Sequence, residues 1–196
     1  MLQIFGYISA LLSIVMIVPY VRDIFRLKTK PERGSWFIWT FLGFIAFFSQ
    51  LAKGATDSLW LTGGQTAAVL VVFLLSLKFG YGGLGKRDSR ALIAAGAGLI
   101  LWYVTREATF AILFVILADS IGTLLTAFKA YEDPKSETFS TWIISAISGV
   151  FGAFAVGSFN LILLAYPIYI ALANSVIVGA ITAGKRRKRG LRILVK

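Results

Sequence analysis

The sequence predicts an all-α integral membrane protein with seven transmembrane helices, built as two parallel three-helix-bundle repeats joined by a connector helix. Three observations lead to this fold class. Hydrophobic residues make up 58% of the 196 residues and the mean hydropathy is +0.80, whereas soluble domains contain about 45–50% apolar residues. The basic residues gather on one side of the predicted spans, and two similar segments recur 103 residues apart.

The composition excludes several classes of protein. The chain has no Cys and no His, which excludes disulfides, structural zinc, and haem or copper held by these residues. Only 15% of the residues are charged and 14% are aromatic, which argues against a disordered chain, a nucleic-acid-binding domain and a soluble enzyme. We therefore expect a protein that is not an enzyme and that needs no cofactor or metal.

Seven apolar stretches approach the length of about 20 residues that a transmembrane helix needs. The first has no basic residues before its apolar run, so we expect a retained span rather than a cleaved signal. The fourth is the shortest and is rich in Ala and Gly. The predicted spans cover residues 3–22, 35–52, 58–78, 90–105, 108–128, 138–156 and 160–183.

The distribution of Lys and Arg orients these spans. With the loops placed alternately on two sides, 18 of the 20 basic residues fall on one side and only Lys53 and Arg106 on the other. Because cytoplasmic loops carry an excess of Lys and Arg, we expect a plasma or inner membrane protein with its N-terminus outside and its C-terminus in the cytoplasm. The net charge of +11 then indicates orientation and contact with anionic lipids, not nucleic-acid binding.

An internal repeat divides the chain. A shift of 103 residues places Pro31 on Pro134 and Trp39 on Trp142, and each of these segments follows a basic loop and opens a span. Four spans separate the two segments, so both triplets start on the same side and are related by an axis along the membrane normal. The predicted division is a first repeat (1–80), a connector loop and helix (81–107), a second repeat (108–184) and a basic cytoplasmic tail (185–196).

The aromatic residues at these span openings have two interpretations. Trp36 and Phe139 lie at the predicted membrane surface, where aromatic residues form a belt. Trp39 and Trp142 lie one turn deeper, so the same pattern allows them to face either the belt or the interior of the bundle.

The segment Pro19–Arg26, continuing to Gly34 and Ser35, resembles a PQ-loop motif. In that family a Pro-Gln pair late in the first helix leads into a basic loop, and a Gly and a Ser open the second helix. The layout of three, one and three helices is similar to SWEET sugar transporters, PQ-loop transporters, KDEL receptors and bacterial vitamin transporters related to nicotinamide riboside carriers. Tyr20 stands where the family has Gln, and Gly122 where a second Pro would lie, so the resemblance does not imply a sugar.

The resemblance implies hinges and a substrate site. SWEET transporters use prolines as hinges, which here implies Pro19 and Pro167, with Gly122 in place of the missing proline. They also place an Asn on the third helix of each half beside the substrate. Asn174 matches one of these positions, Val71 breaks the other, and Gln65 is its replacement.

Asp119 is the strongest single signal, because a charged carboxylate facing lipid costs about 2.5–3.5 kcal/mol. It should therefore face the interior of the bundle. There it couples transport to protons or anchors a polar or cationic solute. The alternative is a structural hydrogen bond, for example to a Tyr on the last span. Near the inner face, Asp23 forms either an ion pair with a nearby arginine that closes the inner gate or a plain surface ion pair.

We therefore expect a transporter of a small polar solute (sugar, vitamin, amino acid or amine) that works by alternating access around a midplane cavity. The alternatives are a receptor of the same fold that moves no solute, and an assembly protein without a ligand. The sequence leaves the oligomeric state open. The predicted substrate-binding residues are Asp119, Asn174, Gln65, Trp39, Trp142 and Tyr169, and the predicted hinge or gate residues are Pro19, Tyr20, Asp23, Gly122 and Pro167.

Overall fold

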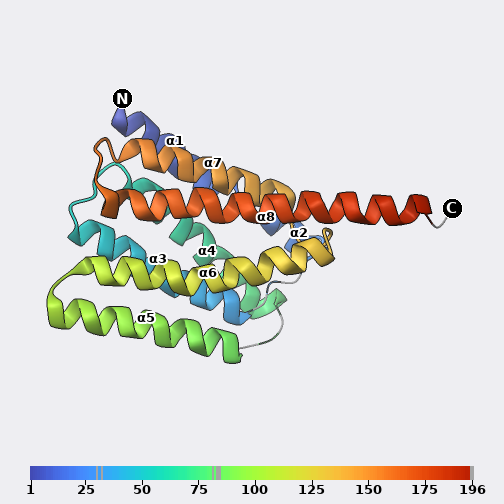
Figure 1. The fold of residues 1–196 in the computed structure, drawn as a ribbon, viewed down its shortest axis with the longest axis horizontal. Coiled ribbons are helices and arrows are strands. Elements are labelled where there is room, and N and C mark those ends of the chain that lie inside the picture. Colours follow the sequence, from blue (N-terminus) through green and yellow to red (C-terminus); the bar gives the residue numbers. More distant parts are fainter. Residues whose placement is uncertain (30, 32, 81, 83–84, 195–196) are drawn as a thin grey trace.

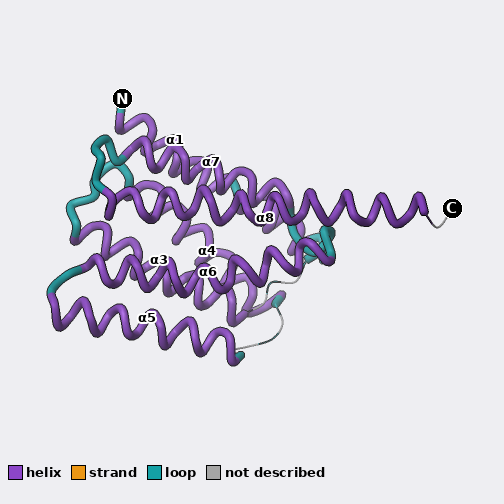
Figure 2. The backbone as a smooth tube through the Cα atoms, viewed as in Figure 1, coloured by secondary structure: helices purple, strands orange, loops and turns teal. Residues whose placement is uncertain are grey.

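The computed structural model describes residues 1–29, 31, 33–80, 82 and 85–194. Over these residues the chain forms helices that lie side by side in a bundle (Figure 1), joined by short loops (Figure 2). The helices are α1 (Leu2–Val15), α2 (Ile17–Phe25), α3 (Arg33–Ala52), α4 (Leu59–Phe79), α5 (Lys86–Thr105), α6 (Ala108–Glu132), α7 (Phe139–Ala155) and α8 (Leu161–Leu194).

The protein is an all-α membrane protein. Four helical segments are long and apolar enough to cross a membrane, and large apolar side chains such as Leu117 (60% exposed) cover their outside. In water this surface would be unfavourable, whereas in a bilayer it is solvated by lipid. The long segments are Leu2–Phe25, Leu59–Phe79, Ala108–Glu132 and Leu161–Arg189, and the shorter apolar helices are Trp36–Ala52, Gly96–Thr105 and Phe139–Ala155. The count of seven spans stays a prediction.

A short break divides the first span. α1 ends at Val15 and α2 begins at Ile17. Pro19 explains this position, because a proline ring clashes with the carbonyl four residues earlier, which here is that of Val15, and provides no N–H to bond it. The chain direction continues through the break, so the two helices together form one spanning segment.

The helices pack in two groups with the same order of contacts. In the first, α4 packs against both α1 and α3. In the second, α8 packs against both α6 and α7. Between the groups, α1 contacts α7 and α3 contacts α6. α5 lies along α6 at the edge of the bundle (Figure 1) and also touches α3.

The bundle has two ends, which we name by their residues. The N-terminal face holds the starts of α1, α4 and α8 at Leu2, Leu59 and Leu161, and the basic face holds the ends of α2 and α4 at Phe25 and Phe79. The basic tail of the sequence continues α8, which extends beyond the other helices at the basic face (Figure 1).

Two contacts of the basic tail attach it to the loop after α6. The Arg187 guanidinium donates to the carbonyls of Tyr131 and Glu132, both at 3.4 Å, and the Lys188 ammonium donates to the Asp133 carboxylate at 2.9 Å. The hydrogen bond from Lys188 lowers the pKa of Asp133 below its ordinary value. The charged form that this contact needs is therefore retained as the pH falls toward the ordinary range of a carboxyl.

Close packing of α7 on α8 depends on Gly149. A Cβ added there would lie 2.6 Å from the Ala171 nitrogen and 2.9 Å from the Pro167 carbonyl oxygen. We expect Gly149→Ala to lower the free energy of unfolding by about 1–3 kcal/mol, because the α8 backbone cannot yield to the methyl group without moving the helix. Thermal unfolding of the purified protein in detergent measures this change.

Gly179→Ala provides the matched control on α8 itself. Nothing lies within 4 Å of a Cβ at Gly179, and alanine favours a helix over glycine. We expect this variant to melt at or above the temperature of the wild type. Equal melting temperatures for Gly149→Ala and Gly179→Ala would show that α7 and α8 do not pack as closely as described.

Candidate binding cavity

A partly open cavity of about 100 Å³ lies in the bundle. It is lined by residues between the two groups of helices, from the middle of the bundle toward the basic face. Five of the six predicted substrate-binding residues line it: Trp39, Gln65, Asp119, Trp142 and Asn174. Their role in binding stays a prediction.

Asp119 lies where the two groups of helices meet. It lies on α6 and its carboxylate Oδ2 accepts a hydrogen bond of 2.5 Å from the hydroxyl of Tyr169 on α8, within the same group. The Trp39 side chain on α3, in the other group, lies beside this carboxylate in the cavity lining. The Tyr169 hydroxyl lies 3.2 Å from the Thr123 hydroxyl as well. Tyr169, the sixth predicted binding residue, therefore positions Asp119.

The structure shows one of the roles that the sequence leaves open for this carboxylate, the structural hydrogen bond, while a role in proton coupling or solute binding stays a prediction. Asp119 makes the structural hydrogen bond to a Tyr of the last helix, and it also lines the cavity. Among the described residues it is the single Asp, Glu, Lys or Arg in the lining. No three acidic side chains of the described residues come together to hold a metal ion.

The two carboxamides of the cavity direct their nitrogens toward the protein. Gln65 Nε2 donates to the Ser145 hydroxyl at 3.1 Å, and Asn174 Nδ2 donates to the Ile170 carbonyl at 2.7 Å. Each carboxamide also has an oxygen, which is an acceptor, and a second N–H, which is a donor. Val71, the position that the resemblance pairs with Asn174, is 44% exposed and is not in the lining. The carboxamides that α4 and α8 contribute to the cavity are Gln65 and Asn174.

Trp36 corrects one prediction. The sequence suggests a place in the interfacial belt, but Trp36 is only 6% exposed and lines the cavity. Its ring lies 5.0 Å from that of Tyr20 and 5.2 Å from that of Trp39. Burial among other rings stabilises an indole more than the interface does. Phe139 keeps the expected position, 37% exposed with the Lys185 ammonium 5.0 Å from its ring.

A hydrogen bond to an ion pair holds the Trp142 ring in place. Its indole Nε1 donates to the Glu137 carboxylate at 3.1 Å, and the Lys129 ammonium donates to the other oxygen of Glu137 at 3.0 Å. The Lys129–Glu137 pair therefore fixes the Trp142 ring that faces the cavity, and Lys129 neutralises the charge of Glu137.

Thr141 is a polar residue of the lining that the sequence does not single out. Thr141 is 4% exposed and its hydroxyl has no hydrogen-bond partner among the described residues. Its spacing of four residues from Ser145, which also lines the cavity, is the helical signal that places the two on one face of α7. A buried hydroxyl without a partner indicates that solvent or a ligand completes its hydrogen bonding.

The predicted hinge and gate residues lie around this cavity. Tyr20 lines it, and a Cβ on Gly122 would be 3.4 Å from Trp39 Nε1. At the basic face, Asp23 accepts a hydrogen bond of 3.4 Å from the Thr138 hydroxyl, which links α2 to the start of α7. α8 is helical through Pro167, so a kink there stays a prediction.

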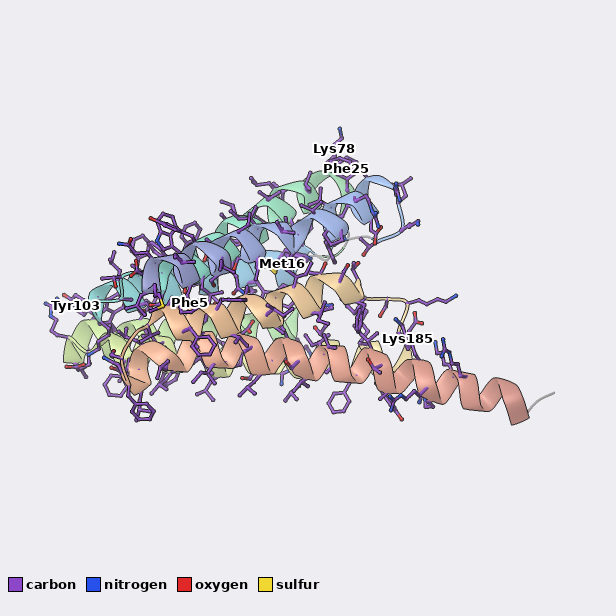
Figure 3. All side chains as sticks on the ribbon, turned by 90° about the horizontal axis from the view of Figure 1, so that it is seen from above. Phe5, Met16, Phe25, Lys78, Tyr103 and Lys185 are labelled. Carbon is purple, nitrogen blue, oxygen red and sulfur yellow. The ribbon has the colours of Figure 1, made fainter. Side chains whose placement is uncertain are left out.

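At the N-terminal face the two groups of helices are packed together. The Ser9 hydroxyl on α1 donates to the Ser148 carbonyl on α7 at 2.8 Å, and Leu61 on α4 is in close contact with Gly152 on α7. Figure 3 shows this closed part near Phe5, and the helices diverge beyond Met16 toward Lys78 and Lys185. The cavity lies in the diverging part.

The closed part contains buried polar groups. Ser13, Ser49 and Gln50 lie between the cavity and the N-terminal face, and each is fully buried. Ser13 Oγ, Ser49 Oγ and Gln50 Nε2 have no hydrogen-bond partner among the described residues, although Gln50 Oε1 accepts from Thr62 at 3.1 Å. We call Ser13, Ser49, Gln50 and Thr62 the polar seam.

Comparisons with protein-family models, with curated proteins and with solved structures find no match to this chain. The candidate site therefore stands on its own geometry: a mid-bundle cavity with one carboxylate, two carboxamides and several aromatic rings.

Proposed function

We propose that the protein transports a small polar solute across a membrane by alternating access, with seven spans arranged as in SWEET and PQ-loop transporters. One observation carries the proposal. The cavity lies in the part of the bundle that diverges toward the basic face, and the closed part on its other side contains the polar seam. The polar seam lies on α1, α3 and α4, at the end of the bundle that must open for water to reach the cavity from the other side.

The energetics of the polar seam support a second, open conformation. A buried polar group without a hydrogen-bond partner costs about 1–3 kcal/mol, and Ser13, Ser49 and Gln50 each contain one. In a bundle that stayed closed, these groups would only destabilise the fold. Opening at the N-terminal face would hydrate them and return part of that free energy, which favours a protein that visits both conformations.

The packing supports two equivalent bodies that rock against each other. α4 contacts α1 and α3 as α8 contacts α6 and α7. At the basic face a Cβ on Gly80 would lie 2.6 Å from the Pro31 carbonyl oxygen, and a Cβ on Gly184 would lie 2.7 Å from Pro134 Cγ. In each group the proline before the second helix thus packs against a glycine near the end of the third, with the two glycines one residue out of register with the 103-residue shift, which supports parallel repeats over 1–80 and 108–184.

Transport requires an orientation, which is part of the proposal. We place the N-terminal face outside and the basic face in the cytoplasm of a plasma or inner membrane, next to anionic lipids. We expect a cysteine replacing Asp57 to react with membrane-impermeant thiol reagents in intact cells. A cysteine replacing Ser136 should react only after the cells are opened. The chain has no Cys of its own, so labelling reports these positions alone, and the reverse pattern would overturn the orientation.

A receptor of the same fold is the second candidate, because a cavity that is open toward one face is also what a receptor needs. Thermal stability against sugars, nucleosides, vitamins, amino acids and amines at pH 5.5 and 7.5 first identifies a ligand, since a ligand of the folded state raises stability. Counterflow of that ligand in proteoliposomes then separates the two functions. Exchange across the membrane supports a transporter, whereas saturable binding without exchange supports a receptor.

A further inference from the structure

The charge of the cavity restricts what it can hold. Asp119 is the one charged residue of the described lining, and no Lys or Arg faces it. Glu137, whose carboxylate bonds the lining residue Trp142, is paired with Lys129 at 3.0 Å. A carboxylate inside a membrane bundle gains most from a cation placed next to it. The same carboxylate repels an anion.

The uncharged groups of the lining favour the same ligand. Gln65 and Asn174 each donate one N–H to the protein, to Ser145 and to the α8 backbone, and each has a carboxamide oxygen that can accept from a ligand. The Thr141 hydroxyl lacks a partner among the described residues and also has lone pairs to offer. Acceptors suit N–H donors or the polarised methyl groups of an ammonium ion.

Aromatic rings line the cavity together with the carboxamide and hydroxyl oxygens. Trp36, Trp39, Trp142, Tyr20 and Tyr166 all line the cavity. A cation within about 6 Å of a ring centre is attracted to the ring face, and aromatic cages of this kind bind quaternary ammonium groups. A neutral polyol would gain stacking on one ring face but would leave Asp119 without a counter-ion.

The volume sets the size of the bound group. A protein cavity of about 150 Å³ holds benzene, which has six heavy atoms. The present cavity of about 100 Å³ therefore holds roughly four heavy atoms in proportion. A trimethylammonium group has this size. Because the cavity is partly open, the rest of a longer molecule extends out of it.

From these four properties we infer that the cavity binds a small organic cation, with its ammonium group between Asp119 and the indoles of Trp39 and Trp142. This inference rests on the proposed function, because it names the class of solute for the same cavity.

A comparison of choline with its neutral carbon isostere, dimethylbutanol, tests the inference. The two molecules have the same shape and differ in charge. Quenching of tryptophan fluorescence in the purified protein measures the binding of each. We expect choline to bind at least about tenfold more tightly, which corresponds to roughly 1.4 kcal/mol. Tetramethylammonium and methylammonium extend the series to smaller cations.

Three variants connect this preference to the cavity. Asp119→Asn should abolish the preference for choline, whereas Asp119→Glu, which retains the charge, should keep choline the tighter ligand. Trp60→Leu is the control for the fluorescence signal, because Trp60 is 48% exposed and stacks on Tyr7 outside the cavity. It should leave both affinities unchanged. The Glu variant and the two-ligand comparison on the wild type decide the question even where Asp119→Asn does not fold.

Two results would overturn the inference. One is equal binding of choline and dimethylbutanol, or binding of no cation in the series. The other is a choline preference that persists in folded Asp119→Asn. Counterflow in proteoliposomes tests the proposed function separately. If choline binds but does not exchange, the proposal of transport fails and the inference of a cation site stands. If a neutral sugar exchanges and choline does not bind, transport stands and the cation site fails.

Discussion

Replacing Asp119 with Asn is expected to abolish accumulation of the transported solute driven by a pH gradient. Asp119 accepts a hydrogen bond from Tyr169 on α8 and lies beside Trp39 on α3, so it stands at the contact between the two groups of helices. A protonated carboxyl is a weaker acceptor than a carboxylate. Binding a proton therefore loosens this connection, while Asn can neither take up nor release one. Uptake into proteoliposomes with a pH gradient imposed in either direction, using the solute found in the thermal screen, measures the effect.

The same chemical change outside the cavity provides the control. Asp57 lies in the loop before α4, and Asp57→Asn should retain accumulation. A second measurement needs no solute. Because the Trp39 side chain contacts Asp119, tryptophan fluorescence should change with pH in the wild type and lose that change in Asp119→Asn. Accumulation that survives in folded Asp119→Asn would exclude proton coupling through this residue.

Fixing the closed end of the bundle is expected to stop transport completely. Leu61 on α4 and Gly152 on α7 belong to different groups of helices, and a Cβ on Gly152 would lie 3.0 Å from the Leu61 Cβ. The Cβ atoms of a disulfide are about 3.8 Å apart, so Leu61→Cys combined with Gly152→Cys needs only a small shift. Oxidation would then hold the N-terminal face closed. Counterflow should fall to the level of empty vesicles and return after reduction.

Each single cysteine variant controls for the loss of packing, since Leu61 is fully buried. Leu61→Cys alone should lose some stability but keep its transport under oxidising conditions. The double variant under reducing conditions should match it. Full transport with the disulfide quantitatively formed would show that the N-terminal face does not open, and the proposal of alternating access would fail.

The sequence predicts the helices well because lipid exposure leaves a simple signal. Long apolar runs bounded by basic loops mark seven helical segments. The position of the break in the first segment follows from the chemistry of Pro19. Asp119 is equally readable, because a carboxylate in an apolar run must face the interior. The prediction for Asp119 depends on a single residue whose charged form has a high free-energy cost in lipid.

The sequence does not predict features that depend on which face of a helix packs against which neighbouring helix. Trp36 looks like a belt residue, because the sequence does not reveal that Tyr20 and Trp39 bury its ring. Ser49 and Gln50 resemble ordinary packing residues, and only the tertiary structure reveals that Ser49 Oγ and Gln50 Nε2 have no hydrogen-bond partner among the described residues. The end of α8 is also hidden, since charges after Ala183 end the apolar run but not the helix.

The length of α8 has a consequence for measurement. The helix is continuous from Leu161 beside the N-terminal face to Leu194 beyond the basic face, a rod of about 50 Å at 1.5 Å per residue. A rigid rod amplifies a small rotation at its packed end into a large displacement at its free end. Each degree of tilt moves the tip by about 0.9 Å at this length. A fluorescent label on the tip of α8 would therefore report small movements of the helix near Asn174 as changes in distance. Single-molecule energy transfer measures such changes.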